Sequence, residues 1–148
     1  MRLIPLLMIF VLVGCEAVPK ASTEADQRAK RFEPPPPNLG AIYVYRPDPK
    51  SLLWGVRIAF IGGITTELST QLPSGTFLRF ESQPGLAEIS CFTTALRDRH
   101  DIEVNAGQIR YFETRVYFGD FSPYCLVREV PADSAQATIL AMTRVEVQ

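Results

Sequence analysis

The chain has 148 residues, of which 15 are lysine or arginine and 16 are aspartate or glutamate, so its formal net charge is −1. Proteins that bind nucleic acid carry a basic surface, and this balance argues against nucleic acid as a partner. The part after residue 38 has the length of one domain and predicts a single hydrophobic core.

The N-terminus carries an export signal that ends in a cysteine. Arg2 precedes an apolar run over residues 3–13, which is too short for a membrane-spanning helix of about 20 residues. The sequence LVGC at residues 12–15 resembles the lipobox of bacterial lipoproteins. We therefore predict a signal peptide over residues 1–14 and a lipid anchor on Cys15, formed by diacylglycerol and a fatty acyl chain such as palmitate.

This resemblance predicts a place in the bacterial cell envelope. Two or three acyl chains hold a protein on a bilayer, because each buried methylene contributes about 0.8 kcal/mol. Glu16 stands where, in the enteric pattern, an aspartate would favour retention in the inner membrane, so we predict the outer membrane, with the domain facing the periplasm. The alternative is an ordinary signal peptide cleaved near Ala17, but the small residues of such a site are missing at the right offsets.

Residues 15–38 are predicted to form a disordered tether. They contain few apolar residues, and they end in four prolines, Pro34–Pro37, which favour a stiff polyproline II conformation. Such a tether would hold the domain a few nanometres from the membrane. Two alternatives are a proline-rich ligand for a partner's aromatic groove and a marginal helix over residues 21–30, which is too short to be stable alone.

From residue 39 onward, apolar residues recur with a period of two. Phe112, Thr114 and Val116, for example, alternate with Glu113 and Arg115, as in a strand with one buried face. Turn sequences rich in glycine and proline separate these runs. We predict a mainly β domain over residues 39–148, a compact antiparallel β-sandwich of seven or eight strands. The strands are expected near residues 41–46, 54–61, 64–70, 76–81, 86–92, 100–105, 108–118 and 124–130.

The end of the chain predicts one helix. Asp133 or Ser134 can cap a run in which Ala135, Ile139 and Met142 recur at helical spacing. The apolar side of this helix would cover an open edge or face of the sheet.

Four short motifs follow one another along residues 41–130: YVYRP at 43–47, a strand and Gly-Gly turn ending at 63, Pro-Gly at 84–85 and AGQIRYF at 106–112. Their order resembles a family of small bacterial envelope lipoprotein domains of unknown function, with a Tyr-x-Tyr-Arg-Pro start and an Ala-Gly-x-x-Tyr strand. The chain departs from that pattern at Phe112, where tyrosine is commoner, and in an insert around residues 50–54. The resemblance implies a β-sandwich in the envelope and no catalytic residue.

Cys91 and Cys125 are predicted to form a disulfide. Each shares a strand face with apolar residues, and two inward-pointing cysteines of an exported domain meet an oxidising compartment. The closed loop of about 35 residues would contribute on the order of 3–4 kcal/mol to stability. The alternative is two separate thiols that pack as small hydrophobic groups.

Groups suited to catalysis are scarce. His100 lies in the charged segment RDRHD at residues 97–101, which we expect to be a solvated turn. One histidine flanked by Asp98 and Asp101 lacks the further ligands of a zinc site. We therefore predict no catalytic residue, no metal and no cofactor, and expect that the protein is not an enzyme. The alternative is a small-molecule-binding or enzymatic site within the sandwich near His100.

The candidate binding residues are four tyrosines and two arginines on neighbouring strands. They are Tyr43, Tyr45, Arg46, Tyr111, Arg115 and Tyr117. If exposed, they would form an aromatic surface suited to a glycan or peptide. The simpler interpretation is packing beneath the C-terminal helix, since tyrosine can bury its ring while its hydroxyl stays polar. Either way we expect a non-catalytic module whose partner is another envelope protein or the cell wall.

Overall fold

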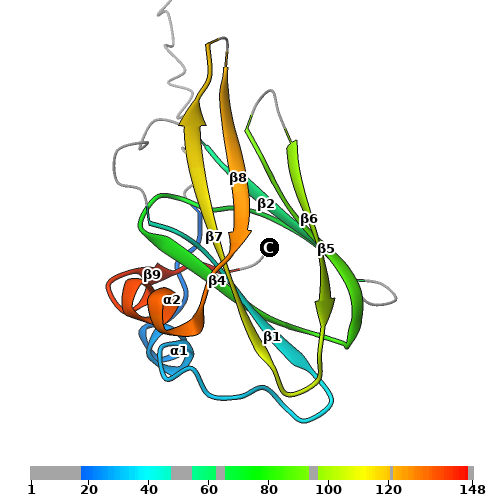
Figure 1. Cartoon of the computed structure of the whole chain (residues 1–148). Helices are drawn as coiled ribbons and strands as arrows, with labels where there is room; N and C mark the ends of the chain where they lie inside the picture. Colours follow the sequence, from blue (N-terminus) through cyan, green and yellow to red (C-terminus); the bar gives the residue numbers. More distant parts are fainter. Residues whose placement is uncertain (1–17, 48–54, 63–65, 94–96, 121, 147–148) are drawn as a thin grey trace, which may run out of the picture.

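The computed structural model describes residues 18–47, 55–62, 66–93, 97–120 and 122–146, and they form a mainly β fold with two helices (Figure 1). The elements, in chain order, are α1 (Thr23–Ala29), β1 (Gly40–Arg46), β2 (Arg57–Gly62), β3 (Thr66–Gln71), β4 (Thr76–Ser82), β5 (Gly85–Phe92), β6 (Arg97–Val104), β7 (Ile109–Phe118), β8 (Pro123–Glu129), α2 (Ala132–Ile139) and β9 (Thr143–Arg144).

The strands form two sheets that pack on each other as a β-sandwich. One sheet has the order β8-β7-β1-β4-β9, and the other has the order β3-β2-β5-β6. Strand β1 is central in the first sheet, where it pairs antiparallel with β4 and parallel with β7. The predicted sandwich is confirmed, although the β1–β7 and β4–β9 pairs are parallel rather than antiparallel.

The space between the sheets holds the main hydrophobic core. Ile42 and Val44 of β1 point into it and meet Phe60 of β2, Ile89 of β5 and Phe112 of β7. These side chains are almost completely buried. Since successive strand residues point to opposite faces, the same pattern turns Tyr43 and Tyr45 to the other side of the sheet.

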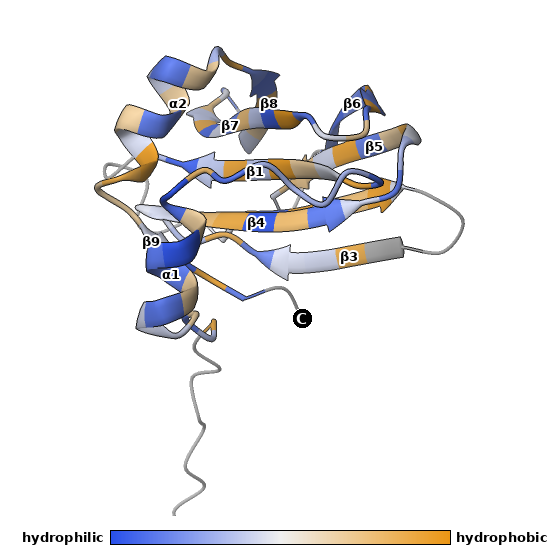
Figure 2. Ribbon diagram, turned by 90° about the horizontal axis from the view of Figure 1, so that it is seen from below, coloured by the Kyte–Doolittle hydropathy of each residue, from blue (hydrophilic) through white to orange (hydrophobic). Residues whose placement is uncertain are grey.

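That other side is covered by the two helices, so β1 is buried along its whole length. Ala29 of α1 and Ala135 and Ile139 of α2 pack with the outward-pointing tyrosines and Phe77 in a second core. Figure 1 shows α1 and α2 next to each other, and in both Figures 1 and 2 the helices lie on the opposite side from β5 and β6. The predicted C-terminal helix is therefore confirmed, but it begins after Pro131, without the expected side-chain cap from Asp133 or Ser134.

The predicted tether is wrong for residues 18–38, which belong to the fold. The Ser22 side chain caps α1 by accepting a hydrogen bond from the backbone N–H of Ala25. Before the helix, Lys20 pairs with Val145 at the other end of the chain. A seven-residue helix is unstable alone, but tertiary contacts hold α1 on the sheet: Ala29 is buried, and Tyr43 and Arg144 form hydrogen bonds with the helix. Residues 15–17, which were also predicted to belong to the tether, lie outside the described residues.

The expected turn at residues 97–101 is also wrong, because these residues form the first half of β6. Strand β6 is an edge of the four-stranded sheet, so its charged side chains can reach water without breaking the core. Charged residues on an edge strand also discourage pairing with another chain. Alternating charge in this segment thus indicates an edge strand rather than a turn.

Candidate functional site

The predicted disulfide joins the two sheets. Cys91 of β5 and Cys125 of β8 are bonded, with their Cα atoms 6.1 Å apart, and both side chains are buried in the core between the sheets. The alternative of two separate thiols is therefore wrong. The third cysteine, Cys15, lies outside the described residues.

The candidate aromatic surface does not exist as a surface. Tyr43, Tyr45 and Tyr111 are buried in the second core, beneath α1 and α2. The rings of Tyr43 and Tyr111 stack with centroids 5.1 Å apart. Packing beneath helices, the simpler of the two interpretations, therefore holds for these three tyrosines, which cannot offer their rings to a glycan.

The hydroxyls of the buried tyrosines hold the helices on the sheet. Tyr43 donates a hydrogen bond to the carbonyl of Ala29 in α1 at 2.7 Å and accepts one from Nε of Arg79 at 3.1 Å. Tyr111 accepts a hydrogen bond from the amide of Gln136 in α2 at 2.8 Å. Burial raises the pKa of Tyr43 and of Tyr111 above the ordinary value, so both stay neutral donors or acceptors.

Arg46, another candidate binding residue, is also buried. Its guanidinium donates a hydrogen bond to the carbonyl of Leu72 at 3.1 Å, which ties the end of β1 to the segment after β3. The role of Arg46 visible in the structure is therefore to hold two segments together.

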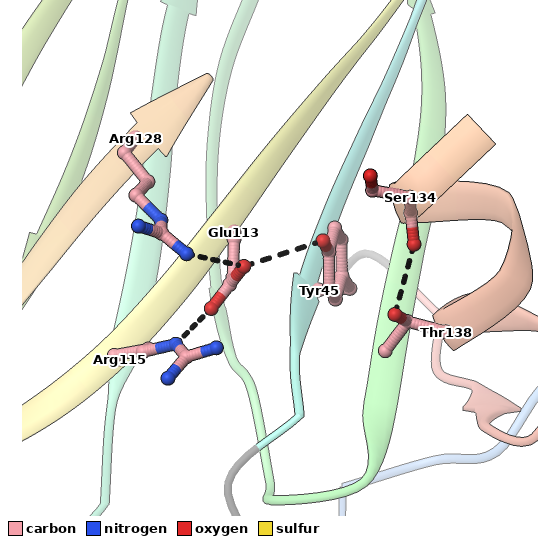
Figure 3. A network of polar contacts seen from close by, with 6 residues as sticks. All are labelled: Tyr45, Glu113, Arg115, Arg128, Ser134 and Thr138. Atoms are coloured by element: carbon pink, nitrogen blue, oxygen red, sulfur yellow. Dashed lines mark hydrogen bonds and ion pairs between the residues drawn. The ribbon is translucent and has the colours of Figure 1, made fainter. Parts of the chain in front are cut away.

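Arg115 takes part in a polar network around Glu113, a buried carboxylate on β7 (Figure 3). Glu113 accepts hydrogen bonds from Arg115 on its own strand and from Arg128 on β8, the latter at 3.1 Å, and its carboxylate lies 3.5 Å from the hydroxyl of Tyr45. Burial, and then the negative charge of Glu113, raise the pKa of Tyr45 to about 12. The two arginines compensate the buried carboxylate, so the network is structural.

Tyr117 is the one tyrosine of the candidate set that the structure leaves exposed, at 39%. It lies near the end of the β7–β8 hairpin and stacks on Tyr124 with ring centroids 5.5 Å apart. Its neighbour Phe118 is 64% exposed. In Figure 1 this hairpin forms the upper end of the molecule. The exposed aromatic area is thus a hairpin end, not a face of the sheet.

His100 is a half-buried strand residue. Its ring lies 5.8 Å from the ring of Phe112, in an edge-on arrangement that connects β6 to the core. The neighbouring Asp98 accepts a hydrogen bond from the backbone N–H of Val127 at 2.9 Å. Among the hollows lined by described residues, none includes His100. No group of three histidine, cysteine or acidic side chains in the described part of the chain is placed to hold a metal ion.

Two of the surface hollows that described residues line differ sharply in chemistry. The first, of about 350 Å³, lies between α1, β4 and β9 and is lined by charged residues, among them Arg79, Glu81 and Arg144. The second, of about 580 Å³, is a shallow and mostly apolar depression beside β5 and β6, where Leu86 is 84% exposed and Ile61 is 46% exposed. Neither contains a nucleophile with a neighbouring base, so both suit binding rather than covalent chemistry.

The charged hollow was not apparent in the sequence. Arg79 and Arg144 are far apart in the chain and meet because β9 pairs with β4 in parallel. One signal was available: Phe77, Arg79 and Glu81 alternate with apolar residues and therefore share the outward face of their strand. A two-residue strand such as β9 leaves no comparable pattern.

Neither α1 nor α2, the helices of the described part of the chain, has the length and apolar character needed to cross a bilayer. Comparisons of the chain with protein-family models, with curated proteins and with solved structures found no match. The resemblance to envelope lipoprotein domains therefore stays a prediction.

Proposed function

We propose that this chain is a lipid-anchored protein of the bacterial outer membrane, facing the periplasm, whose β-sandwich is a non-catalytic module for binding another envelope protein or the cell wall. The observation that carries the proposal is the Cys91–Cys125 disulfide. Structural disulfides persist in oxidising compartments and are rare in the cytosol. The disulfide therefore supports export, which the N-terminal apolar run and the lipobox-like LVGC also favour.

The start of the folded domain bears on how the anchor would hold it. Lys20 pairs with Val145, and the backbone N–H of Glu146 donates to the carbonyl of Pro19 at 3.0 Å. Only three peptide links separate Cys15 from Val18. An extended chain spans at most about 3.6 Å per residue, so a lipid on Cys15 would keep the domain within roughly 10 Å of the bilayer. A partner would be met next to the membrane.

The anchor is tested with Cys15→Ser and fractionation of cells. We expect the wild-type protein to partition with membranes and to incorporate labelled palmitate, and the variant to do neither, because the rest of the N-terminus has too little apolar surface to bind. Glu16→Asp is the matched control: it keeps the lipidated cysteine, so it should stay in the membrane fraction. A processed Cys15→Ser protein that remains membrane-bound would contradict the proposal.

The binding role is tested by crosslinking in intact cells. A photo-crosslinking amino acid at Leu86, beside the apolar depression, samples the four-stranded sheet, and the same group at Leu140, after α2, samples the helical side. Both positions are exposed. A binding module should give a discrete adduct with an envelope protein or peptidoglycan at one position and not at the other. Equal, diffuse labelling at both positions would contradict a specific partner.

A further inference from the structure

The hollow beside α1 brings together three arginines from three separate elements. Arg28 comes from α1, Arg79 from β4 and Arg144 from β9, and they line the hollow with two carboxylates, Glu33 and Glu81. Its volume of about 350 Å³ has room for a small organic group. Like charges gathered in this way repel one another unless each has a partner.

Two of the three arginines have a carboxylate partner. Arg28 pairs with Glu24 at 2.7 Å, and Arg79 pairs with Glu81 at 2.9 Å. Arg144 has no carboxylate within ion-pair distance in the described part of the chain. Arg144 is therefore the arginine of this hollow that has no direct carboxylate partner, and Glu146 and Asp26 act on its charge only at longer range.

The nearby acidic groups are engaged elsewhere. The carboxylate of Asp26 pairs with Lys30 at 2.7 Å and also accepts a hydrogen bond from the backbone N–H of Arg144. Glu33 lies 3.6 Å from Arg31, and both of these side chains are exposed. The charge of the Arg144 guanidinium thus faces the hollow without a dedicated counterion from the protein.

The guanidinium of Arg144 also keeps free donors. It donates to the carbonyl of Ala25 and to the carbonyl of Arg79, each at 3.2 Å, while its Nε is buried without a hydrogen-bond partner. A guanidinium has five N–H groups, so these two bonds leave donors unused. Burial, followed by repulsion from Arg79, lowers the pKa of Arg144 below the ordinary value. An anion in the hollow would accept hydrogen bonds from the unused terminal N–H groups of Arg144 and would offset its repulsion from Arg79.

We propose that this hollow is a binding site for a singly charged oxyanion, a carboxylate or a phosphodiester, held by Arg144 with Arg79 beside it. One cation without a direct carboxylate partner favours one negative charge, and the planar guanidinium matches the paired oxygens of both groups. This oxyanion site specifies a ligand class for the binding module proposed above, and it therefore rests on that proposed function. Binding of an anion to the purified protein does not require lipid on Cys15, so the two proposals can fail separately.

The site is tested by titrating the full chain, in micelles of uncharged dodecyl maltoside at low ionic strength, with acetate and with dimethyl phosphate. Nitrogen–proton spectra of the arginine side chains should shift for Arg144 and Arg79. Arg144→Gln should weaken binding by roughly tenfold or more, since a charge-assisted pair is lost. Arg99→Gln removes the same charge from exposed β6 and should change affinity less than about twofold. Equal affinity in Arg144→Gln would overturn the proposal, and so would the absence of a saturable shift with both of these probes and with the anionic lipid used below.

A second variant keeps the test independent of folding, because Arg144 also contacts α1. Glu81→Gln removes the carboxylate that pairs with Arg79 and leaves Arg144 unchanged. We expect it to raise the affinity for both probes by about threefold, because a second cation becomes available. A residue with a merely structural role would not strengthen binding when replaced. Unchanged or weaker binding in a folded Glu81→Gln protein would overturn the proposal.

The source of the anion is distinguished by micelle composition. Dodecyl maltoside micelles that contain phosphatidylglycerol should shift Arg144, and micelles of dodecyl maltoside alone, which carry no phosphodiester, should not, if the site takes a lipid headgroup next to the membrane. A response to dimethyl phosphate in solution without a response to phosphatidylglycerol would assign the site to a soluble ligand. Either result upholds an oxyanion site, and a failure of all three probes to shift Arg144 contradicts it.

Discussion

The two faces of the five-stranded sheet are buried by different means. The inner face packs on the second sheet with aliphatic and phenylalanine side chains, and the Cys91–Cys125 disulfide lies in the same layer. The outer face packs on α1 and α2 with tyrosines, whose hydroxyls bond to Ala29, Arg79 and Gln136. Figure 2 shows the apolar residues along β1 and β4 and the mixed surface of the helices.

This difference follows from what lies opposite each face. A sheet offers only side chains to its neighbouring sheet, so apolar groups suffice there. The last carbonyls of a helix lack the usual intrahelical partner, and a tyrosine can fill space with its ring while its hydroxyl bonds to such a carbonyl. The carbonyl of Ala29 accepts from Tyr43 in this way and also from the backbone N–H of Phe32. The inner face therefore depends on apolar packing, and the outer face combines packing with directional bonds that hold the helices in place.

The largest expected effect comes from the inner face. Phe112→Ala should lower the free energy of unfolding by about 3–5 kcal/mol, because it removes a completely buried ring and leaves a cavity. Urea unfolding followed by circular dichroism measures the change. A loss below about 1 kcal/mol would mean that the two sheets are not packed as described.

The second prediction concerns the disulfide in the same layer, which stabilises the fold by restricting the unfolded chain. Cys91→Ala and Cys125→Ala should each cost about 3–4 kcal/mol, because the bond closes a loop over a sequence separation of 34 residues. The double variant should cost little more than either single one, since each removes the same link. Unfolding with and without reductant measures this. A wild-type protein insensitive to reductant, or additive single effects, would contradict a stabilising bond.

On the outer face, removal of the Tyr43 hydroxyl measures the contribution of its hydrogen bonds separately from the packing of its ring. Tyr43→Phe keeps the ring but removes two hydrogen bonds, and should cost about 1–3 kcal/mol. Hydrogen exchange should show earlier opening of α1 in the variant. Tyr117→Phe, at an exposed ring, is the control and should change stability by less than about 0.5 kcal/mol. Equal effects of the two changes would show that α1 is not held through Tyr43.

The contact between His100 of the edge strand β6 and Phe112 of the core should also contribute to stability. Since its ring packs against Phe112, His100→Ala should cost about 1 kcal/mol, more than a solvated turn residue would. Arg99→Ala, at the exposed neighbour, should cost less than about 0.5 kcal/mol.

The His100→Ala variant also tests the proposed non-catalytic role. If a stable and correctly located His100→Ala protein fails to rescue a phenotype of the deletion strain, the non-catalytic proposal is wrong.

The smallest expected effect is electrostatic and lies at the rim of the sheet. The hydrogen bonds from Arg110, at 2.7 Å for the Nε contact, lower the pKa of Glu129 below its ordinary value near 4.5. The contribution of this pair is complete above the ordinary pKa and is lost as the pH falls through the lower, folded-state pKa. Because the pair is partly exposed, it should contribute less than about 1 kcal/mol. Stability measured from pH 6 to pH 3 should fall less in Glu129→Gln than in the wild type.

The strands could be predicted because a period of two is a local property. Alternation in residues 109–118 shows which residues share a face. The same kind of alternation around Cys91 and around Cys125 correctly predicted that both side chains point toward an apolar interior. The final helix likewise followed from the spacing of Ala135 and Ile139. The lipobox-like sequence at residues 12–15 is also local, and the anchor that it predicts awaits the fractionation test.

What covers each face was decided only by the tertiary structure. The pattern around Tyr43 and Tyr111 is the same for a solvated face and for one beneath a helix, and only α1 and α2 make these rings interior. Residues 18–38 have the composition of a tether, yet α1 is held by contacts with distant residues, among them Tyr43 and Arg144, and by the pairing of Lys20 with Val145. The charged hollow depends on contacts between residues 65 or more positions apart. Such contacts leave no trace in local composition, because the free energy that forms them comes from burial across the whole fold.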